Sequence, residues 1–280
     1  MKTVNTQKPI FVVGAPKAGS TSIHYALAET YLFDYPSVKD THYLLNENFD
    51  LNSYSKYFEC NGKPIFEVDQ NLAISNQAFV NIRSFFSEGV IIYVIRNQKD
   101  RFLSAYKWLL KMGGNYKSIG HAIDEEYNWM IAHGLYKKNI ESHILPNLSS
   151  GFEFYVVKFE DLLDENGVTY RSLMKLLNID VDPDAKLPTY NKSLVARSHT
   201  IMVILKKILS KCRFIFPDHF IGFVKKSKLV EMLLFTKSKK FNFDENIFCE
   251  YAEQFSDTES YINKLNFKKG IVRLDKNEET

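Results

Sequence analysis

Residues Ile10–Ser22, which read IFVVGAPKAGSTS, decide the fold class of this chain. The apolar run Ile10–Val13 is typical of a strand buried in a parallel sheet, and Gly14 and Gly19 mark a turn directly after it. A helical pattern opens at Ser20. The first turn of a helix has unpaired backbone N–H groups and a positive dipole end, both of which suit a phosphate. The stretch therefore predicts that the chain binds a phosphorylated nucleotide.

The lysine of this turn stands inside the loop. A P-loop of the form G-x-x-x-x-G-K-S/T would carry lysine directly after Gly19, whereas this chain has Ser20 there and Lys17 earlier. The run from Pro16 to Thr21, P-x-x-G-S/T-S/T with lysine second, resembles the 5′-phosphosulfate loop of sulfotransferases that use 3′-phosphoadenylyl sulfate (PAPS). A glycine-rich turn with a solvated lysine is the plainer alternative for this loop taken alone.

A second constellation lies at Val90–Tyr106, which reads VIIYVIRNQKDRFLSAY. Its apolar run predicts a buried strand that ends in Arg96, and open α/β sheets bind ligands at the carboxyl ends of their strands. A guanidinium group holds two phosphate oxygens, and the hydroxyl of Ser104, two helical turns later, is placed to donate to the same group. The run resembles the sulfotransferase 3′-phosphate motif R-N-P-x-x-R-x-x-S-x-Y, with Gln98 in place of the proline. The alternative is ion pairing of the arginines, and for Arg101 we expect pairing with an acid such as Asp100 or Glu160.

The two motifs follow each other in the order of the PAPS-dependent sulfotransferases, about eighty residues apart, and the chain is similar to that family in its bacterial, carbohydrate sulfotransferase-like form. The resemblance implies PAPS as sulfonate donor and adenosine 3′,5′-bisphosphate (PAP) as product. It also implies the residues that hold the donor, which are Lys17, Ala18, Gly19, Ser20, Thr21, Ser22, Arg96 and Ser104. Weaker matches extend along the chain, including Tyr155–Leu162, which resembles the family's strand ending in E-D-L.

Sulfonate transfer to an alcohol requires a base for the acceptor's proton. The segment Pro36–Tyr43 lies where carbohydrate sulfotransferases carry a K-E-x-H-F-F-like run, so that Asp40 and His42 align with its glutamate and histidine. Aspartate is one methylene shorter than glutamate, and both residues therefore stand as candidate bases. Glu67 and Asp69, after the second apolar run, are further acids that could face the cleft.

The catalytic residues predicted in this way are Lys17, Asp40 and His42. An acceptor hydroxyl would attack the sulfur of PAPS while Lys17 stabilises the negative charge that grows on the bridging oxygen. No metal is required by this mechanism. A P-loop kinase is the rival enzyme class, because Asp69 after Ile65–Val68 imitates the end of a Walker-B strand; a non-catalytic nucleotide-binding or glycan-binding protein is the third alternative.

Apolar runs at Ile10–Val13, Ile65–Val68, Val90–Ile95 and Phe152–Phe159 alternate with helical patterns, which predicts a parallel sheet flanked by helices. The helical patterns cover Ser20–Tyr31, Gln98–Met112, Ile119–His133, Tyr170–Leu177, Ile201–Ser210 and Glu245–Phe255. We expect one α/β domain over residues 1–280 with P-loop NTPase-like sulfotransferase topology, and flexible tails at 1–8 and 271–280. The 280-residue length is enough for a large single core.

Composition excludes several protein classes. The 45% hydrophobic and 25% charged residues are those of an ordinary globular protein. Cys60, Cys212 and Cys249 have no C-x-x-C spacing, so neither a disulfide framework nor a zinc site is predicted. The first nine residues are polar, unlike a signal peptide, and we expect a cytoplasmic protein.

The acceptor is predicted only by class. The K-D-x-H-Y segment resembles carbohydrate sulfotransferases and favours a glycan or other hydroxyl-bearing acceptor. Between residues 197 and 240 there are eleven basic residues against Asp218 and Glu231, a balance that could contact an anionic membrane surface or a polyanionic glycan. A solvated positive face is the slightly favoured alternative. No nucleic-acid-binding module accompanies the charge, so we expect no nucleic-acid partner.

Overall fold

The structure is a computed structural model that describes residues 8–112, 114–188, 194–196, 235–237 and 246–275. The predicted helix at Ile201–Ser210 and most of the basic segment 197–240 lie outside the described residues. The membrane or glycan contact of that segment therefore stays a prediction, as does the single domain over the whole chain.

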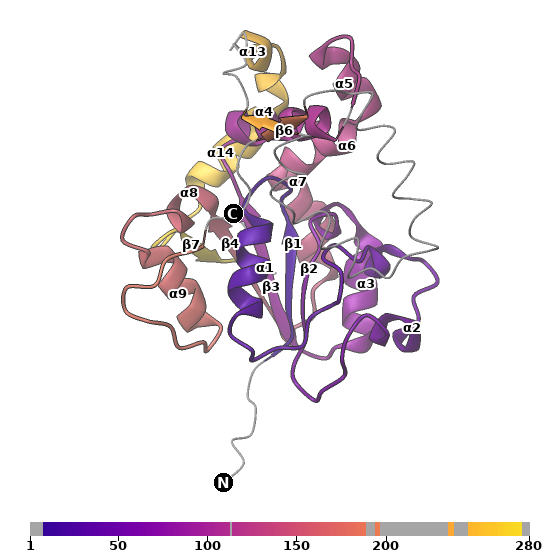
Figure 1. Ribbon diagram of the computed structural model, residues 1–280, viewed down its shortest axis with the longest axis vertical. Helices are drawn as coiled ribbons and strands as arrows, with labels where there is room; N and C mark the ends of the chain where they lie inside the picture. The colour runs from indigo at the N-terminus through magenta and orange to yellow at the C-terminus, as the bar shows by residue number, and fades with distance from the viewer. Residues whose placement is uncertain (1–7, 113, 189–193, 197–234, 238–245, 276–280) are drawn as a thin grey trace.

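A five-stranded sheet forms the centre of the molecule, in the order β2-β1-β3-β4-β7 (Figure 1). Its strands are β1 (Ile10–Gly14), β2 (Phe66–Val68), β3 (Gly89–Ile95), β4 (Phe152–Lys158) and β7 (Ile271–Arg273). The first four are parallel and β7 is antiparallel to β4. The chain adds β2 on one side of β1 and then crosses to add β3 on the other. The order therefore reverses between β1 and β3, and the carboxyl ends of these two strands flank the switch point where open α/β sheets bind ligands.

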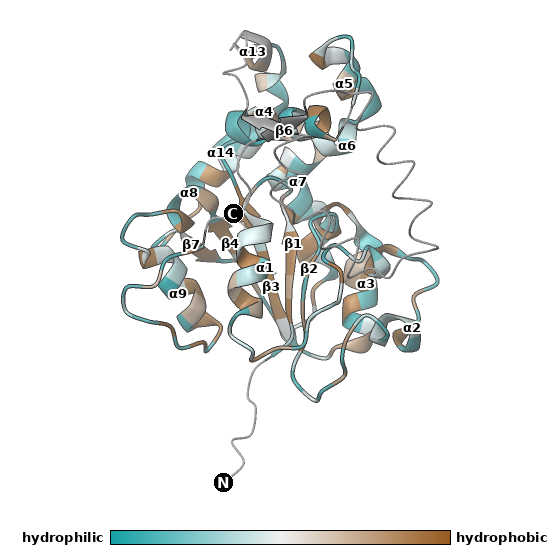
Figure 2. Cartoon of the chain, in the orientation of Figure 1, coloured by the Kyte–Doolittle hydropathy of each residue, from teal (hydrophilic) through white to brown (hydrophobic). Residues whose placement is uncertain are grey.

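Burial explains why these runs form strands. All residues of β1 and β3 are buried, as a parallel sheet covered on both faces requires, and Figure 2 shows the central strands as the most hydrophobic elements. The predicted α/β fold with a mostly parallel sheet is confirmed, and each of the four predicted strands is present within one or two residues. The tail predicted at 271–280 is wrong at its start, because Ile271–Arg273 pair with Tyr155–Val157 of β4.

Helices surround the sheet, and α1 crosses its front in Figure 1. The α-helices are α1 (Ser20–Ala28), α2 (Leu51–Ser55), α3 (Asn76–Phe85), α4 (Gln98–Lys111), α5 (Ile119–Glu125), α6 (Tyr127–Met130), α7 (Tyr136–Lys138), α8 (Phe159–Leu162), α9 (Val168–Leu176), α13 (Asn246–Ala252) and α14 (Ser256–Lys264). Short 3-10 turns are η1 (Tyr43–Leu45), η2 (Leu72–Ile74), η3 (Ala132–Gly134), η5 (Leu145–Asn147) and η6 (Glu253–Phe255), and η4 (Asn139–Ile144) is a π-helix. A separate antiparallel pair joins β5 (Leu194–Ala196) to β6 (Phe235–Lys237).

Two helix predictions differ from the structure. The helix predicted over Ile119–His133 is three short pieces. Glu126, between α5 and α6, has φ −125° and ψ 40°, outside the helical region, and Ile131, between α6 and η3, has φ −111° and ψ −62°. Helix α3 was not predicted, although its start carries a recognisable cap: the hydroxyl of Ser75 accepts a hydrogen bond from the Ala78 amide.

The apolar core has two parts. The larger cluster surrounds the sheet and includes Phe11, Val12, Ile92 and Val156. The smaller cluster packs α4 against α5, α6 and η6 around Phe102 and Phe255, both fully buried. In Figure 1 these elements gather beyond the carboxyl end of the sheet. This second cluster holds the start of α4 in place beside the switch point.

Candidate active site

The turn between β1 and α1 has the geometry of an anion-binding loop. The Ala15 amide donates to the Val94 carbonyl at 2.7 Å, which ties the turn to β3. Gly19 begins α1 with φ 83°, and a Cβ at this position would collide with the ring of Phe159. Only glycine fits both constraints. No side chain caps α1 at Gly19, so the helix start presents main-chain N–H groups rather than a capping hydroxyl.

Lys17 is half-buried in this turn and has a left-handed backbone, with φ 69°. The pKa of Lys17 is lowered to about 8, mainly by burial and also by the nearby positive charges of Lys111, Arg96 and Lys39. Four cations therefore share one region of the molecule. Such a concentration of like charge, partly withdrawn from water, favours binding of an anion.

Arg96 links the carboxyl ends of three strands. One guanidinium nitrogen, Nη1, donates to the Lys17 carbonyl at 2.9 Å, and the guanidinium lies over the Phe159 ring with its carbon 5.0 Å from the ring centre. The Tyr136 hydroxyl accepts from the Arg96 amide at 3.1 Å and donates to the Arg96 carbonyl at 2.8 Å. The Arg96 Nε is buried and has no hydrogen-bond partner in the described residues. A donor left in that state is available to an oxyanion.

Ser104 lies on the second turn of α4 and is half-buried. The structure thus keeps both members of the predicted 3′-phosphate pair at the β3–α4 junction, with no hydrogen bond between them. Gln98, which replaces the motif's proline, is buried, and its amide donates to the Gly134 carbonyl at 2.6 Å.

The acidic partner expected for Arg101 is wrong. Arg101 is fully buried, and its guanidinium donates to the main-chain carbonyls of Trp129 and Met130 in the second apolar cluster. Glu160 instead accepts from the Asn97 amide at 2.8 Å. Arg101 therefore joins α4 to α6, and the carbonyls at the end of a neighbouring helix supply its partial negative charge.

The two candidate bases lie on one loop that returns to the end of β2. Asp40 and His42 both have φ 57°, and the Asp40 amide donates to the Val68 carbonyl at 3.2 Å. The Asp40 carboxylate pairs with Lys39 Nζ at 2.7 Å and accepts from the Gln70 amide at 3.2 Å. The imidazole of His42 is half-exposed, and its Nδ1 lies 3.0 Å from Asp69 Oδ2. The hydrogen bond to Asp69 is the main reason that the pKa of His42 is raised.

Glu67 anchors the same loop from below. Its carboxyl group is fully buried and accepts hydrogen bonds from the hydroxyls of Thr41 and Tyr54. Burial raises the pKa of Glu67 to about 7, although the two hydrogen bonds act in the opposite direction. Side chains two residues apart on a strand point to the same face of the sheet. Glu67 lies on β2 and Asp69 directly after it, so both side chains reach the loop that carries Thr41 and His42. The sequence identified the two acids but not their partners.

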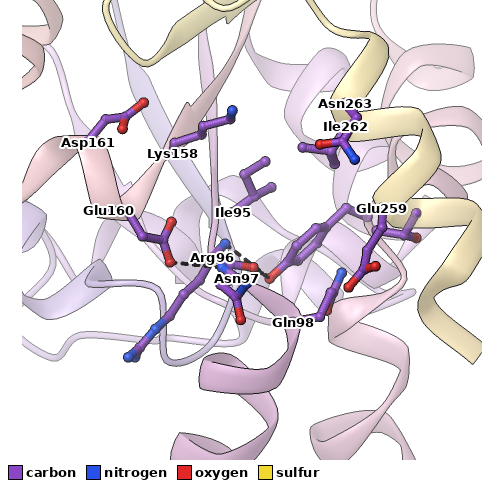
Figure 3. A pocket seen from close by; sticks show the side chains of 12 residues that line it. Ile95, Arg96, Asn97, Gln98, Lys158, Glu160, Asp161, Glu259, Ile262 and Asn263 are labelled. Atoms are coloured by element: carbon purple, nitrogen blue, oxygen red, sulfur yellow. Dashed lines mark hydrogen bonds between the residues drawn. The ribbon is translucent and has the colours of Figure 1, made fainter. Parts of the chain in front are cut away.

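A cavity of about 490 Å³ opens beside Arg96, between the ends of β3 and β4 and helix α14. Figure 3 shows Glu259, Ile262 and Asn263 from α14 across from Arg96 and Glu160. The volume is in the range of small-molecule sites. Lys17, Asp40 and His42 do not line this cavity, so it adjoins only the Arg96 side of the predicted site.

A sequence profile of the sulfotransferase domain matches residues 7–199, more than half of the chain. The chain belongs to the sulfotransferase family. The crystal structure of a sulfotransferase from Alicyclobacillus acidocaldarius aligns with a TM-score of 0.55 and 18% sequence identity, over 66% of this chain and 87% of that one. The sulfotransferase domain from the curacin biosynthetic pathway aligns with a TM-score of 0.46 and 17% identity, over 67% and 79%. No curated protein matches the chain in sequence.

The profile match confirms the family that the two sequence motifs indicated, and the alignment with the Alicyclobacillus structure shows a similar fold. The roles of the individual site residues stay predictions. Among the described residues, no group of three His, Cys, Asp or Glu side chains is arranged to hold a metal ion. None of the helices in the described ranges has the length and apolar character needed to cross a bilayer.

Proposed function

We propose that this sulfotransferase-family protein transfers the sulfonate group of PAPS to a hydroxyl of a carbohydrate-containing acceptor. The observation that carries the donor assignment is the 2.9 Å hydrogen bond from Arg96 to the Lys17 carbonyl. It brings the two predicted phosphate-binding motifs together at the switch point between β1 and β3, although they are about eighty residues apart in the sequence.

The two ends of the donor would be bound by segments that follow different strands, β1 and β3. The loop amides, Lys17 and the hydroxyls of Ser20, Thr21 and Ser22 would hold the 5′-phosphosulfate at the start of α1. Arg96, with its unpartnered Nε, and Ser104 would hold the 3′-phosphate. Lys111, Arg96 and Lys39 place positive charge near Lys17, which suits a donor that carries negative charge at both ends.

The chemistry balances without a further reactant. The acceptor oxygen forms a bond to sulfur while the bond from sulfur to the 5′-phosphate oxygen breaks, and PAP leaves with that electron pair. The acceptor's proton goes to a base at the end of β2. Lys17, held beside the bridging oxygen, would stabilise the charge that develops there.

Ligand binding separates this proposal from the kinase alternative. The Asp69 carboxylate, which a kinase would need for Mg²⁺, accepts N–H groups of His42 and Asn71, and this arrangement favours the sulfotransferase. We expect PAP without metal to raise the melting temperature, because it binds only the folded state, and ATP with Mg²⁺ to raise it much less. A larger shift with ATP and Mg²⁺ would overturn the donor assignment.

Turnover separates an enzyme from a non-catalytic binding protein. Incubation with labelled PAPS and a panel of cell-surface glycans, lipid-linked sugars and small alcohols, followed by mass spectrometry, should identify a sulfated sugar. Arg96→Lys is the matched variant, since it keeps the charge but loses the bidentate fork, and we expect weaker PAP binding by about 1 kcal/mol or more. Binding of PAP with no product from any acceptor would support the non-catalytic alternative.

A further inference from the structure

The end of β2 distinguishes between the two candidate bases by the partners it gives them. Asp40 and His42 are two residues apart and have the same left-handed backbone. Their side chains, however, are engaged very differently. One is paired with a cation and the other with an anion.

Both carboxylate oxygens of Asp40 are engaged by donors. Its Oδ2 lies 2.7 Å from Lys39 Nζ, and its Oδ1 accepts the Gln70 amide at 3.2 Å. Both side chains of the ion pair are mostly buried, with about a fifth of each exposed. Each carboxylate oxygen of Asp40 thus already has a hydrogen-bond donor directed at it.

The side chain of His42 is paired with the carboxylate of Asp69. Asp69 Oδ2 accepts the His42 amide at 2.7 Å and lies 3.0 Å from its Nδ1, while Asp69 Oδ1 accepts the Asn71 amide at 3.0 Å. The Asp69 side chain is fully buried and the imidazole is half-exposed. Both Asp69 oxygens already accept main-chain N–H groups, so the carboxylate is also the acceptor in its contact with Nδ1, and the Nδ1 atom carries the proton of the neutral ring. The lone pair is then on Nε2, the nitrogen on the far side of the ring from Asp69.

We propose that Asp69 is the positioning residue that makes His42 the general base, an inference that rests on the sulfonate transfer proposed above. His42 Nε2 takes the proton of the acceptor hydroxyl as that oxygen bonds to sulfur and PAP departs. The imidazolium formed in this step keeps its Nδ1–H directed at the Asp69 carboxylate, which stabilises the new positive charge. Asp69 orients the ring through two contacts, one to the side chain and one to the main chain of the same residue.

The surroundings of the pair support this role. Glu67 binds the Thr41 hydroxyl directly before His42, so that the loop is attached to β2 at two successive residues. Asn71 Nδ2 also faces His42 Nδ1, at 3.3 Å, while Asn71 Oδ1 lies 3.1 Å from His133 Nε2. The Asn71 amide is a donor and competes with Asp69 for Nδ1, but the Asp69 Oδ2 contact of 3.0 Å is the shorter of the two. Asp69, Asp40 and Glu67 are the charged groups that raise the pKa of His42, while its partial burial acts against them.

An NMR measurement tests the tautomer without any acceptor. The protein labelled with ¹⁵N-histidine should give, for neutral His42, a protonated Nδ1 and an unprotonated Nε2, with the His42 signal assigned by its loss in His42→Ala. The pKa of this ring should lie above 6.5 and should fall in Asp69→Asn, which removes the negative charge. Asp34→Asn is the matched control: Asp34 is also buried, and its carboxylate accepts the main-chain amides of Glu59 and Cys60.

Kinetics with the acceptor found in the panel test the catalytic consequence. We expect Asp69→Asn to lower kcat by about a hundredfold or more and to move the acid limb of the kcat/KM profile to lower pH, while PAP affinity stays within twofold. Asp40→Asn should cost less than His42→Ala. A neutral His42 protonated on Nε2, or a larger loss in Asp40→Asn than in His42→Ala, would overturn the inference. If the wild type neither binds PAP nor forms product, the proposed function itself fails.

Discussion

At the scale of single residues, the site contains ionisable side chains that are partly or fully buried, and burial disfavours the charged form of such a group unless a partner compensates. Lys17 is half-buried near three other cations, and Glu67 is buried with two hydroxyls. The sequence places a lysine in the loop and an acid on the strand. Whether the pKa of Lys17 or Glu67 rises or falls depends on residues that surround it in space but are distant in the sequence.

The pKa of Lys17 predicts how donor affinity depends on pH. Free Lys17 loses its proton as the pH rises through about 8, and bound PAP raises that pKa because it favours the charged form. The association constant of PAP should therefore be flat near pH 7 and fall above pH 8, by up to about tenfold per pH unit. Calorimetric titration at pH 7, 8 and 9 measures this. Lys17→Arg keeps its charge and should remove the fall; parallel curves for the two proteins would contradict the prediction.

The pKa of Glu67 predicts a stability difference. Because its folded pKa of about 7 lies above the unfolded value of 4.5, Glu67 contributes stability that is fully present below pH 4.5 and is lost as the pH rises through 7. The shift corresponds to about 3 kcal/mol. Urea unfolding at pH 5 and pH 8 should show the wild type losing about this much relative to Glu67→Gln, which does not titrate. Equal differences at the two pH values would disprove the assignment.

At the scale of elements, the strand-to-helix junctions were the most predictable part of the chain. β1 with α1, and β3 with α4, start and end within a few residues of their predicted bounds, because apolar runs, glycines and caps act locally. The helix over 119–133 was mispredicted since its apolar periodicity continues through Glu126, where the backbone leaves the helical region. The partner of Arg101 was mispredicted for another reason. The guanidinium donates to main-chain carbonyls, and because every residue has one, the sequence does not indicate which of them it will meet.

Gln98 offers a test of how α4 begins. Proline is tolerated at the first position of a helix, but Gln98→Pro would remove the buried hydrogen bond to the Gly134 carbonyl. We expect a loss of about 1 to 3 kcal/mol, as for an unsatisfied buried acceptor, measured by urea unfolding. Gln98→Ala separates the two effects, because it removes the bond without the ring. A Gln98→Pro protein as stable as the wild type would show that this hydrogen bond does not stabilise α4.

At the scale of the whole molecule, the sheet order brings the site together. β1 and β3 are neighbours only because β2 is added on the far side of β1. The second apolar cluster, around Phe102 and Phe255, then covers the carboxyl end of the sheet beside Arg96. Donor binding should accordingly protect two distant segments of the chain at once.

Hydrogen exchange measures this joint protection. With PAP bound, peptides covering residues 14–24 and 94–104 should exchange more slowly, because both ends of the ligand then restrain the loop after β1 and the start of α4. Helix α9 covers Val168–Leu176 and lies away from the carboxyl ends of β1 and β3 in Figure 1, so its peptides are the internal control. Protection of only one of the two segments would contradict a site that spans the switch point.

The sequence by itself determined the family, the parallel sheet and the two motifs predicted to bind phosphate, because each of these depends on residues that are neighbours along the chain. Only the tertiary structure decided which side chains meet. The contact of His42 with Asp69, the contact of Arg96 with the Lys17 carbonyl and the burial of Arg101 against α6 join residues separated by 27, 79 and 28 or more positions. Such contacts depend on strand order and helix packing, which set distances in space that no local pattern of residues encodes.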